Sequence, residues 1–264
     1  MPGSADPPSA AADGPAEIIR ADRATRRFGS LTAVSDVSFN VSAGDIVGLA
    51  GSDGAGKTTL LRMLAAMLAP SSGTIRVGGL DVVRERSRVK ELIGYMPQRF
   101  GLYPDLTVAE NLDFFIDIYG ISGVERDRRR ERYLGFSDLL PFVDRKAADL
   151  SGGMKQKLGL ACVLVHEPRL LILDEPTNGV DPLSRQEFWQ ILAEMKQAGM
   201  TILVATAYLD EGERCDRLLL MHNTRILADA APAKIRAEFA SLEEAMIQRI
   251  RAVDAELTED AFGR

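Results

Sequence analysis

The stretch Gly51-Ser52-Asp53-Gly54-Ala55-Gly56-Lys57-Thr58-Thr59 matches the pattern G-x-x-x-x-G-K-[ST], which forms a phosphate-binding loop between a strand and a helix. The apolar run over 45–50 precedes it and predicts a buried strand. Leucines recur at helical spacing after it, until Pro70 ends the pattern. Because this order of strand, glycine-rich turn and helix is the one that the loop requires, we predict a phosphate site at 51–59.

The residue types in this loop suit a nucleotide triphosphate. Its three glycines let the backbone curl so that several N–H groups point at one anion, helped by the positive end of the following helix. Lys57 can reach the terminal phosphates, Thr58 offers a hydroxyl to Mg²⁺, and Thr59 can bond the phosphate nearest the sugar. The alternative is a glycine-rich turn that happens to precede Lys-Thr, and the flanking strand and helix argue against it.

The composition excludes several classes of protein. With 264 residues, 46% of them apolar, the chain can build a sizeable core as one large domain or two small ones. The net charge of -6 argues against a broad nucleic-acid-binding surface, so we expect no nucleic-acid partner. Cys162 and Cys215 are predicted to be small core residues, not a disulfide or a zinc site. No membrane-spanning run or signal peptide is expected, and the cysteine usage suits a reducing compartment.

Strands and helices alternate along most of the chain. Residues 1–16 contain little to bury and are predicted to be a disordered lead-in. A charged helix is predicted over 82–92, and a wholly helical block over 108–140. The predicted strands cover 18–28, 33–41, 45–50, 74–77, 93–96, 170–173, 201–205, 218–221 and 225–227. The sequence therefore predicts an α/β fold with an inserted α-helical block.

Two further segments have a structural interpretation. The arginine-rich run 126–132 could bind anions, but its interleaved acids and helical setting favour a solvated helix face. The apolar positions between 242 and 257 form a helical stripe, which we expect to pack on the domain and not to bind a membrane.

Two acids, Asp174 and Glu175, follow directly after the fully apolar strand 170–173. Carboxylates at the exit of a buried strand are unfavourable unless they have a charged partner. In a protein with a phosphate loop that partner is Mg²⁺, bound by Asp174, while Glu175 is free to orient a nucleophilic water. The alternative is a strand that merely ends in a polar turn.

The segment Leu150-Ser151-Gly152-Gly153-Met154-Lys155-Gln156-Lys157-Leu158 completes a set of four motifs. The phosphate loop, a glutamine after a strand, Ser-Gly-Gly, and a strand ending in Asp-Glu occur here in the order found in ABC-type ATPases, which the chain resembles over 17–232. The resemblance implies a P-loop NTPase (RecA-like) core with an ABC-type antiparallel β subdomain. It also implies a helical subdomain at about 97–160 and a C-terminal helical extension at 233–264.

The resemblance also implies roles for residues outside the loop. Ser151, Gly152 and Gly153 match the segment that caps a nucleotide held by a second cassette, either an identical chain or a separately encoded paralogue. Gln98 matches the glutamine that senses the metal site, takes part in catalysis and contacts the transport subunit. Phe28 matches the aromatic residue that stacks on adenine, although a plain strand-end phenylalanine is the alternative. The run 179–182 matches the loop by which two cassettes touch.

Three positions depart from the family pattern. Ser52-Asp53 replaces the commoner Pro-Asn, and Met154 replaces a glutamine. Ala207 stands where most ABC ATPases have a histidine that touches the γ-phosphate. A hydrogen bond to a charged group contributes about 1.5–3 kcal/mol, so its loss corresponds to about 10- to 150-fold in rate. We therefore predict a slow but active site. The segments 95–103 and 205–211 are similar to bacterial multidrug-exporter ATPases of the YbhF kind, which share the Thr-Ala-Tyr run.

The resemblance implies an ATP-hydrolysing subunit of an ABC exporter, and similarity to multidrug exporters implies that the cargo is small molecules such as drugs. It would act peripherally on the cytoplasmic side of the inner membrane, with two permease subunits or one fused permease. Glu175 would polarise water, and Lys57 with Mg²⁺ would stabilise the transferring phosphoryl group. One alternative is a binding-only cassette beside a more active partner. The other is a soluble ABC ATPase acting on ribosomes or DNA, against which the acidic charge balance argues.

Overall fold

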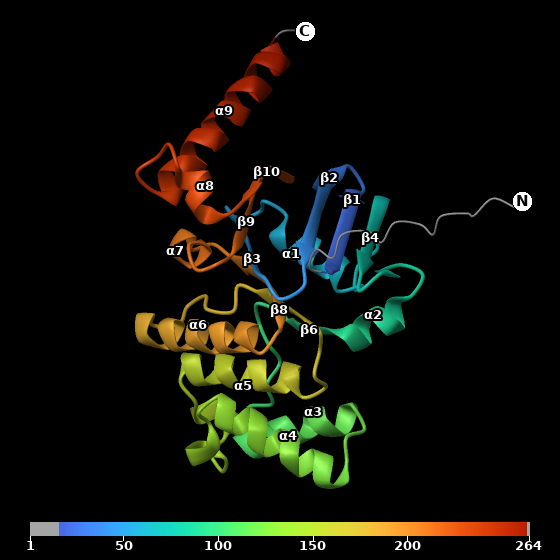
Figure 1. The fold of residues 1–264 in the computed structure, drawn as a ribbon, viewed down its shortest axis with the longest axis vertical. Helices are drawn as coiled ribbons and strands as arrows, with labels where there is room; N and C mark the ends of the chain where they lie inside the picture. Colours follow the sequence, from blue (N-terminus) through green and yellow to red (C-terminus); the bar gives the residue numbers. More distant parts are fainter. Residues whose placement is uncertain (1–15, 263–264) are drawn as a thin grey trace, which may run out of the picture.

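The computed structural model describes residues 16–262, with side chains described through residue 253. Residues 1–15, most of the predicted disordered lead-in, lie outside this range. Ala16 is the first described residue, and its carbonyl accepts a hydrogen bond from the N–H of Ala43. Figure 1 shows the strands together at the middle of the molecule, with most helices below them and the last helix above.

The strands form two sheets. The antiparallel sheet has the order β2-β1-β4-β5, and the larger sheet has the order β10-β9-β3-β8-β7-β6, in which β10 alone among the described strands runs antiparallel to its neighbour. The antiparallel sheet consists of β1 (Glu17–Phe28), β2 (Leu31–Ser42), β4 (Ser72–Val77) and β5 (Leu80–Asp81). The larger sheet consists of β3 (Ile46–Gly51), β6 (Ile93–Met96), β7 (Leu170–Asp174), β8 (Thr201–Thr206), β9 (Arg217–His222) and β10 (Arg225–Ala230).

The strands β3, β7 and β8 of the larger sheet are buried on both faces, as continuous apolar strands require. Successive residues of a strand point to opposite faces, so Leu170 and Ile172 of β7 join one core while Leu171 and Leu173 join the other. The first core also contains the antiparallel sheet and α1 (Lys57–Leu64). Cys162 lies in the second core, and its pKa is raised by burial, in agreement with its predicted core role.

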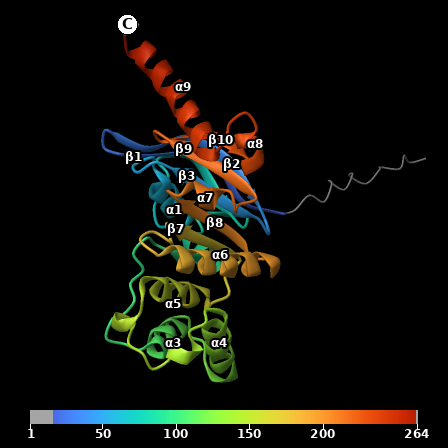
Figure 2. The same ribbon diagram turned by 90° about the vertical axis from the view of Figure 1, so that its left-hand side faces the viewer.

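The helices of the second core lie in layers. In Figures 1 and 2, α6 (Pro182–Gln197), α5 (Gly152–Leu164), and the pair α3 (Val108–Ile118) and α4 (Gly123–Phe136) follow one another below the strands. The remaining helices, with two short 3₁₀ turns, are α2 (Arg86–Leu92), η1 (Leu140–Phe142), η2 (Ala147–Asp149), α7 (Leu209–Gly212), α8 (Pro232–Arg236) and α9 (Leu242–Phe262).

Two predicted helix boundaries were wrong. The helix after the phosphate loop ends at Leu64, because Ala66 has a left-handed φ of 52° and the N–H groups of the next two residues both bond to the carbonyl of Arg62. The charged helix begins at Arg86, since the carboxylate of Asp81 accepts two backbone N–H groups in the preceding turn. The predicted helical block at 108–140 consists of α3 and α4, and the turn between them includes Gly120, which has a φ of 66°.

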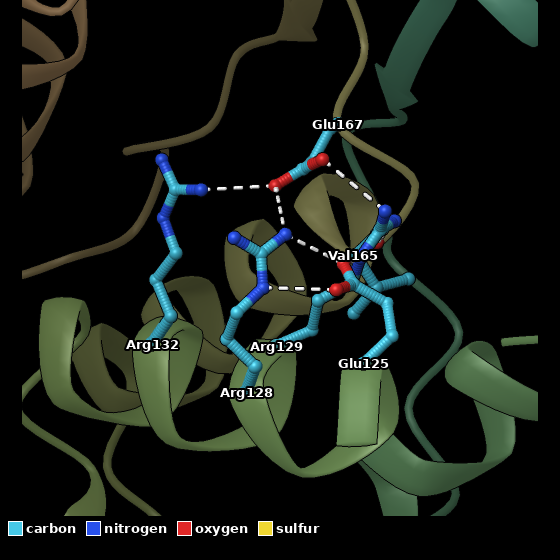
Figure 3. Close-up of polar contacts among 6 residues, drawn as sticks. All are labelled: Glu125, Arg128, Arg129, Arg132, Val165 and Glu167. Carbon is cyan, nitrogen blue, oxygen red and sulfur yellow. Dashed lines mark hydrogen bonds and ion pairs between the residues drawn. The ribbon is translucent and has the colours of Figure 1, made fainter. Parts of the chain in front are cut away.

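The arginine-rich run is neither a free anion site nor a simply solvated face. Figure 3 shows Arg128, Arg129 and Arg132 of α4 grouped around Glu125 and around Glu167, which lies in the turn after α5. Arg129 is only 16% exposed and also donates to the carbonyl of Val165. Hydrogen bonds from Arg128 and then Arg129 lower the pKa of Glu125 to about 2. These ion pairs fasten α4 to the end of α5.

Among the residues whose side chains are described, the C-terminal helix packs on the protein through its first turns. Leu242, Ala245 and Met246 are buried against Leu218 and Leu220 of β9. Farther along, α9 extends away from the rest of the molecule in both ribbon views. The predicted packing therefore applies to the start of the stripe, and the side chain at 257 lies outside the described range. Over residues 16–262, none of the helices combines the length and apolar character that a membrane crossing needs.

Candidate functional site

The phosphate-loop residues lie where β3 ends and α1 begins, beside the ends of the neighbouring strands. Parallel strands end at the same edge of a sheet, so residues that follow β6 and β7 meet the loop there. They surround a cavity of about 440 Å³. Its lining includes Leu31, Thr32, Ala33, Asp53, Gly54, Ala55, Gly56, Lys57, Thr58, Thr59, Gln98, Glu175 and Asn178. Predicted residues from three segments thus meet here: the loop, Gln98 and Glu175. Gly51 and Ser52 begin the same loop but are not among the lining residues.

Two glycines of the loop are required by close backbone contacts. A Cβ atom at Gly51 would lie 2.1 Å from the carbonyl oxygen of Met221, and one at Gly56 would lie 2.2 Å from that of Ala33. Gly56 also has a φ of 107° and is the N-cap of α1, where no side chain caps the helix. The first N–H groups of α1 therefore remain available to an anion, and the helix dipole favours negative charge at that point.

The ammonium group of Lys57 is held inside the loop. The side chain is only 5% exposed, and Nζ donates to the carbonyl oxygens of Gly51 at 2.8 Å and Ser52 at 3.1 Å. Oε1 of Glu175 lies 3.4 Å from Nζ. A positive charge is thus fixed at the loop, directly beside the carboxylate that the sequence predicts to act on water.

The carboxylate of Glu175 is oriented by two amide side chains. Its Oε2 atom accepts hydrogen bonds from Nδ2 of Asn178 at 3.2 Å and from Nε2 of Gln98 at 2.8 Å. Glu175 has a left-handed φ of 51°, a strained conformation for a residue with a side chain, and its N–H donates to the carbonyl of Ala205. The backbone and side chain of Glu175 are therefore constrained from several directions.

Asp174 and Thr58 form the oxygen cluster predicted to bind a metal ion. Oγ1 of Thr58 donates to Oδ1 of Asp174 at 3.0 Å, and the hydroxyl of Tyr95 donates to Oδ2 at 3.3 Å. Burial raises the pKa of Asp174, and these two hydrogen bonds oppose that effect. Burial, with the nearby Asp174 charge, raises the pKa of Tyr95 to about 12. The hydroxyl and carboxylate oxygens suit Mg²⁺, which is usually held by one or two protein groups together with substrate phosphates. Gln98, the third predicted metal ligand, contacts Glu175 instead of Asp174.

Phe28 lies at the rim of the site. It ends β1 opposite Leu31, which lines the cavity, but the described lining does not include Phe28 itself. The ring is 46% exposed, and the guanidinium of Arg26 lies 4.5 Å from its centroid. The predicted adenine contact therefore remains a prediction.

The Ser-Gly-Gly segment is not brought to the cavity. Ser151 caps α5 by accepting the N–H of Met154, and both Ser151 and Gly152 are exposed. Gly153 is buried against Ser184 of α6, so closely that a Cβ atom at Gly153 would lie 2.4 Å from the Ser184 side chain. The start of α5 thus presents bare N–H groups to the outside of this chain.

Sequence reasoning missed three polar residues around the site: Tyr95, Asn178 and Glu211. Tyr95 lies in β6, which pairs with the strand that carries Asp174, so only strand order could have revealed it. Asn178 follows Glu175 closely, and its position near two predicted site acids was the available signal.

Ala207, where the resemblance leads one to expect a histidine, is exposed immediately after β8.

The strand–loop–helix geometry and the acids at the sheet edge define a P-loop nucleotide-binding domain. The sequence pattern of ABC transporters matches residues 34–178. The chain belongs to the ABC transporter family, as an ATP-binding cassette, and the predicted family and fold class are confirmed.

Two relatives and one solved structure illustrate this membership. The "Probable multidrug ABC transporter ATP-binding protein YbhF" of Escherichia coli (strain K12) is 47% identical over 84% of this chain, which spans only 39% of YbhF. The "Nod factor export ATP-binding protein I" of Paraburkholderia xenovorans (strain LB400) is 40% identical over 84% of this chain and 74% of that protein. A solved ATP-binding subunit of an ABC transporter has a TM-score of 0.78 and 31% identity, covering 88% of this chain and 99% of its own.

Proposed function

We propose that this chain binds and hydrolyses ATP at the loop 51–59 and powers export through separate membrane permease subunits. The observation that carries this proposal is the meeting of Lys57, Gln98 and Glu175 around one cavity at the strand edge. A phosphate-binding loop placed beside an oriented carboxylate is the arrangement that phosphoryl transfer to water requires. The names of two relatives refer to a multidrug transporter and to Nod factor export. These names support export as the direction of transport.

The residues have separate roles in this proposal. Main-chain N–H groups of the loop and Lys57 bind the phosphates, and Glu175 polarises the attacking water. Thr58 and Asp174 would hold Mg²⁺, with Gln98 as a third ligand if its side chain turned from Glu175, and the ion would neutralise charge on the phosphates. Phe28 contacts adenine at the rim of the site.

We also propose that two cassettes close around ATP. The exposed start of α5, with Ser151 at its N-cap, lies outside the cavity of its own chain but offers N–H groups to a phosphate held by another. The loop 179–182, which precedes α6, provides a second contact between cassettes. The partner cassette is either a second copy of this chain or a paralogue.

A second cavity supports contact with a permease. It measures about 340 Å³ and shares Gln98 with the nucleotide cavity, so a group seated there can influence the orientation of Glu175. Its lining residues are Gln98, Arg99, Phe100, Leu102, Pro104, Ala147, Ala148, Lys155 and Gln156. In this proposal the chain binds its permease at this cavity, at the cytoplasmic side of the membrane.

A binding-only cassette is the second candidate function. The observation that favours it is Ala207, which offers no polar side chain at the end of β8 where most ABC ATPases have a histidine. To separate the two, phosphate release and ATP affinity are measured for the chain alone and with the permease that copurifies in mild detergent, beside the matched variant Lys57→Ala. Turnover that depends on Lys57 supports hydrolysis. ATP binding without turnover in either preparation supports the second candidate, and absence of ATP binding contradicts both.

A further inference from the structure

Glu211 of α7 is a buried carboxylate outside the cavity. Its side chain is 1% exposed, although carboxylates are seldom buried without compensating partners. Three groups from separate elements supply that compensation. Oγ1 of Thr177 donates to Oε1 at 2.6 Å, Oγ1 of Thr206 donates to Oε2 at 2.6 Å, and Nε of Arg185 donates to Oε1 at 3.1 Å. One carboxylate therefore joins the turn after β7 and the end of β8 to α6.

Thr177 connects this carboxylate to the turn that carries Glu175. It is 2% exposed and lies directly before Asn178, whose amide donates to Glu175. The N–H of Asn178 also bonds to the carbonyl of Glu175, which closes the turn. Because Glu175 has a left-handed φ, this turn keeps its shape only while the surrounding contacts hold it. Glu211 supplies one such contact through its hydrogen bond with Thr177.

Thr206 connects the same carboxylate to the strand end before Ala207. Its hydroxyl donates to Glu211 and accepts the N–H of Tyr208, so it fixes the chain on both sides of Ala207. Arg185 lies in α6, so its hydrogen bond to Glu211 extends the contact to that helix. The guanidinium of Arg185 also donates to Asp210 and lies 4.2 Å from the Tyr208 ring centroid. The turn at Glu175, the segment at Ala207 and the first turns of α6 are thus held in one arrangement.

We infer that Glu211 is a positioning residue for ATP hydrolysis, which fixes the carboxylate of Glu175 through Thr177 and Asn178. This inference rests on the proposed hydrolytic function. With alanine at 207, no histidine contributes at the end of β8, so turnover depends on the orientation of Glu175. Glu211 does not reach the cavity lining, and its effect is therefore on the rate of hydrolysis and not on the affinity for ATP.

The test compares Glu211→Gln, Thr177→Val and Thr177→Ser with the wild-type chain. In Glu211→Gln the amide nitrogen must face at least one of the three donors, which weakens the cluster without changing its size. Both Glu211→Gln and Thr177→Val should lower kcat about 10- to 100-fold, the range expected when a catalytic group is misplaced. The Kd for ATP should change less than about twofold. Thr177→Ser, which keeps the hydroxyl, should restore most of kcat.

The matched control is Glu213→Gln, which removes an exposed carboxylate that pairs with Arg236 and lies outside this cluster. It should leave kcat, Kd and the melting temperature near their wild-type values. The inference is overturned if Glu211→Gln keeps kcat within about twofold, or if kcat and ATP affinity fall together. If Glu211→Gln does not fold, the inference is tested by Thr177→Val and Thr177→Ser alone, and equal kcat values in these two variants overturn it. Absence of turnover in the wild-type chain contradicts the proposed function and this inference together, whereas wild-type turnover with unchanged variants contradicts the inference alone.

Discussion

Replacing Glu175 by Gln tests the proposed reaction most directly. The substitution keeps the size of the side chain but removes the negative charge that lies 3.4 Å from Nζ of Lys57. It also removes the acceptor that can take a proton from water. If Glu175 acts as general base, its loss should lower kcat by about 10² to 10⁴, the usual contribution of such a group. This corresponds to about 3–5.5 kcal/mol in activation free energy.

ATP affinity should respond in the opposite direction. The Coulomb attraction between Lys57 and Glu175 at 3.4 Å is about 5 kcal/mol with an effective dielectric constant of about 20. Desolvation of the two groups offsets most of it. In the wild-type chain, Lys57 must exchange this partner for a phosphate. In Glu175→Gln there is no charged partner to lose, so the Kd for ATP should stay unchanged or fall by up to about tenfold.

The assay combines phosphate release with equilibrium binding of ATP, both at saturating Mg²⁺. Glu238→Gln, which removes an exposed carboxylate between α8 and α9, is the matched control and should behave like the wild-type chain. Turnover of Glu175→Gln within about tenfold of wild type would refute the role of Glu175 as base. Weaker ATP binding in that variant would refute the reasoning about Lys57.

Three further predictions follow from the structure. Ala207→His should raise turnover several-fold, up to about 150-fold, because an imidazole at the end of β8 adds a hydrogen bond to the γ-phosphate in the transition state. Tyr95→Phe removes a donor to Asp174 and should raise the Mg²⁺ concentration needed for half-maximal turnover about two- to tenfold. Glu125→Gln should lower the melting temperature near neutral pH, and this difference should shrink as pH falls from about 4.5 to about 2, since the folded-state pKa of Glu125 is depressed.

Each of these predictions has a control and a contradicting outcome. An unchanged or lower rate in Ala207→His, measured by phosphate release, would show that the missing histidine does not limit turnover. For Tyr95→Phe the control is Tyr133→Phe, at a buried tyrosine of α4, and an unaltered Mg²⁺ titration would contradict the role of Tyr95. For Glu125→Gln, melting curves across pH are compared with those of Glu131→Gln on the same helix. A stability difference that persists at pH 2 would contradict the ion-pair explanation.

The sheet core and the phosphate loop could be predicted because each has a local signal. Continuous apolar runs such as 170–173 identify strands buried on both faces, and the loop 51–59 has a fixed pattern of glycines and lysine. Helix ends were harder to predict. Leu68 continues the helical spacing of α1, but it packs against the first core from a turn, after the chain has left the helix.

The cluster around Glu211 could not be predicted from local patterns. Thr177 and Thr206 have no periodic relation to Glu211, and the carboxylate becomes a partner for both only after β7 and β8 pair. Tyr95 is a similar case, because its hydroxyl meets Asp174 across neighbouring strands. Sequence patterns identified the segments that surround the cavity at the loop 51–59, while side-chain packing decides which polar groups touch within them.

The tight backbone contacts at Gly51 and Gly56 affect how inactive variants should be interpreted. Each glycine abuts a carbonyl of another strand, one in β9 and one in β2, so an added methyl group would clash with the backbone of that strand. A chain with alanine at either position could lose activity through misfolding while its chemistry is sound. Screens for nonfunctional mutants will therefore score these two glycines alongside the reactive groups, and only a folding assay on each mutant distinguishes architecture from catalysis.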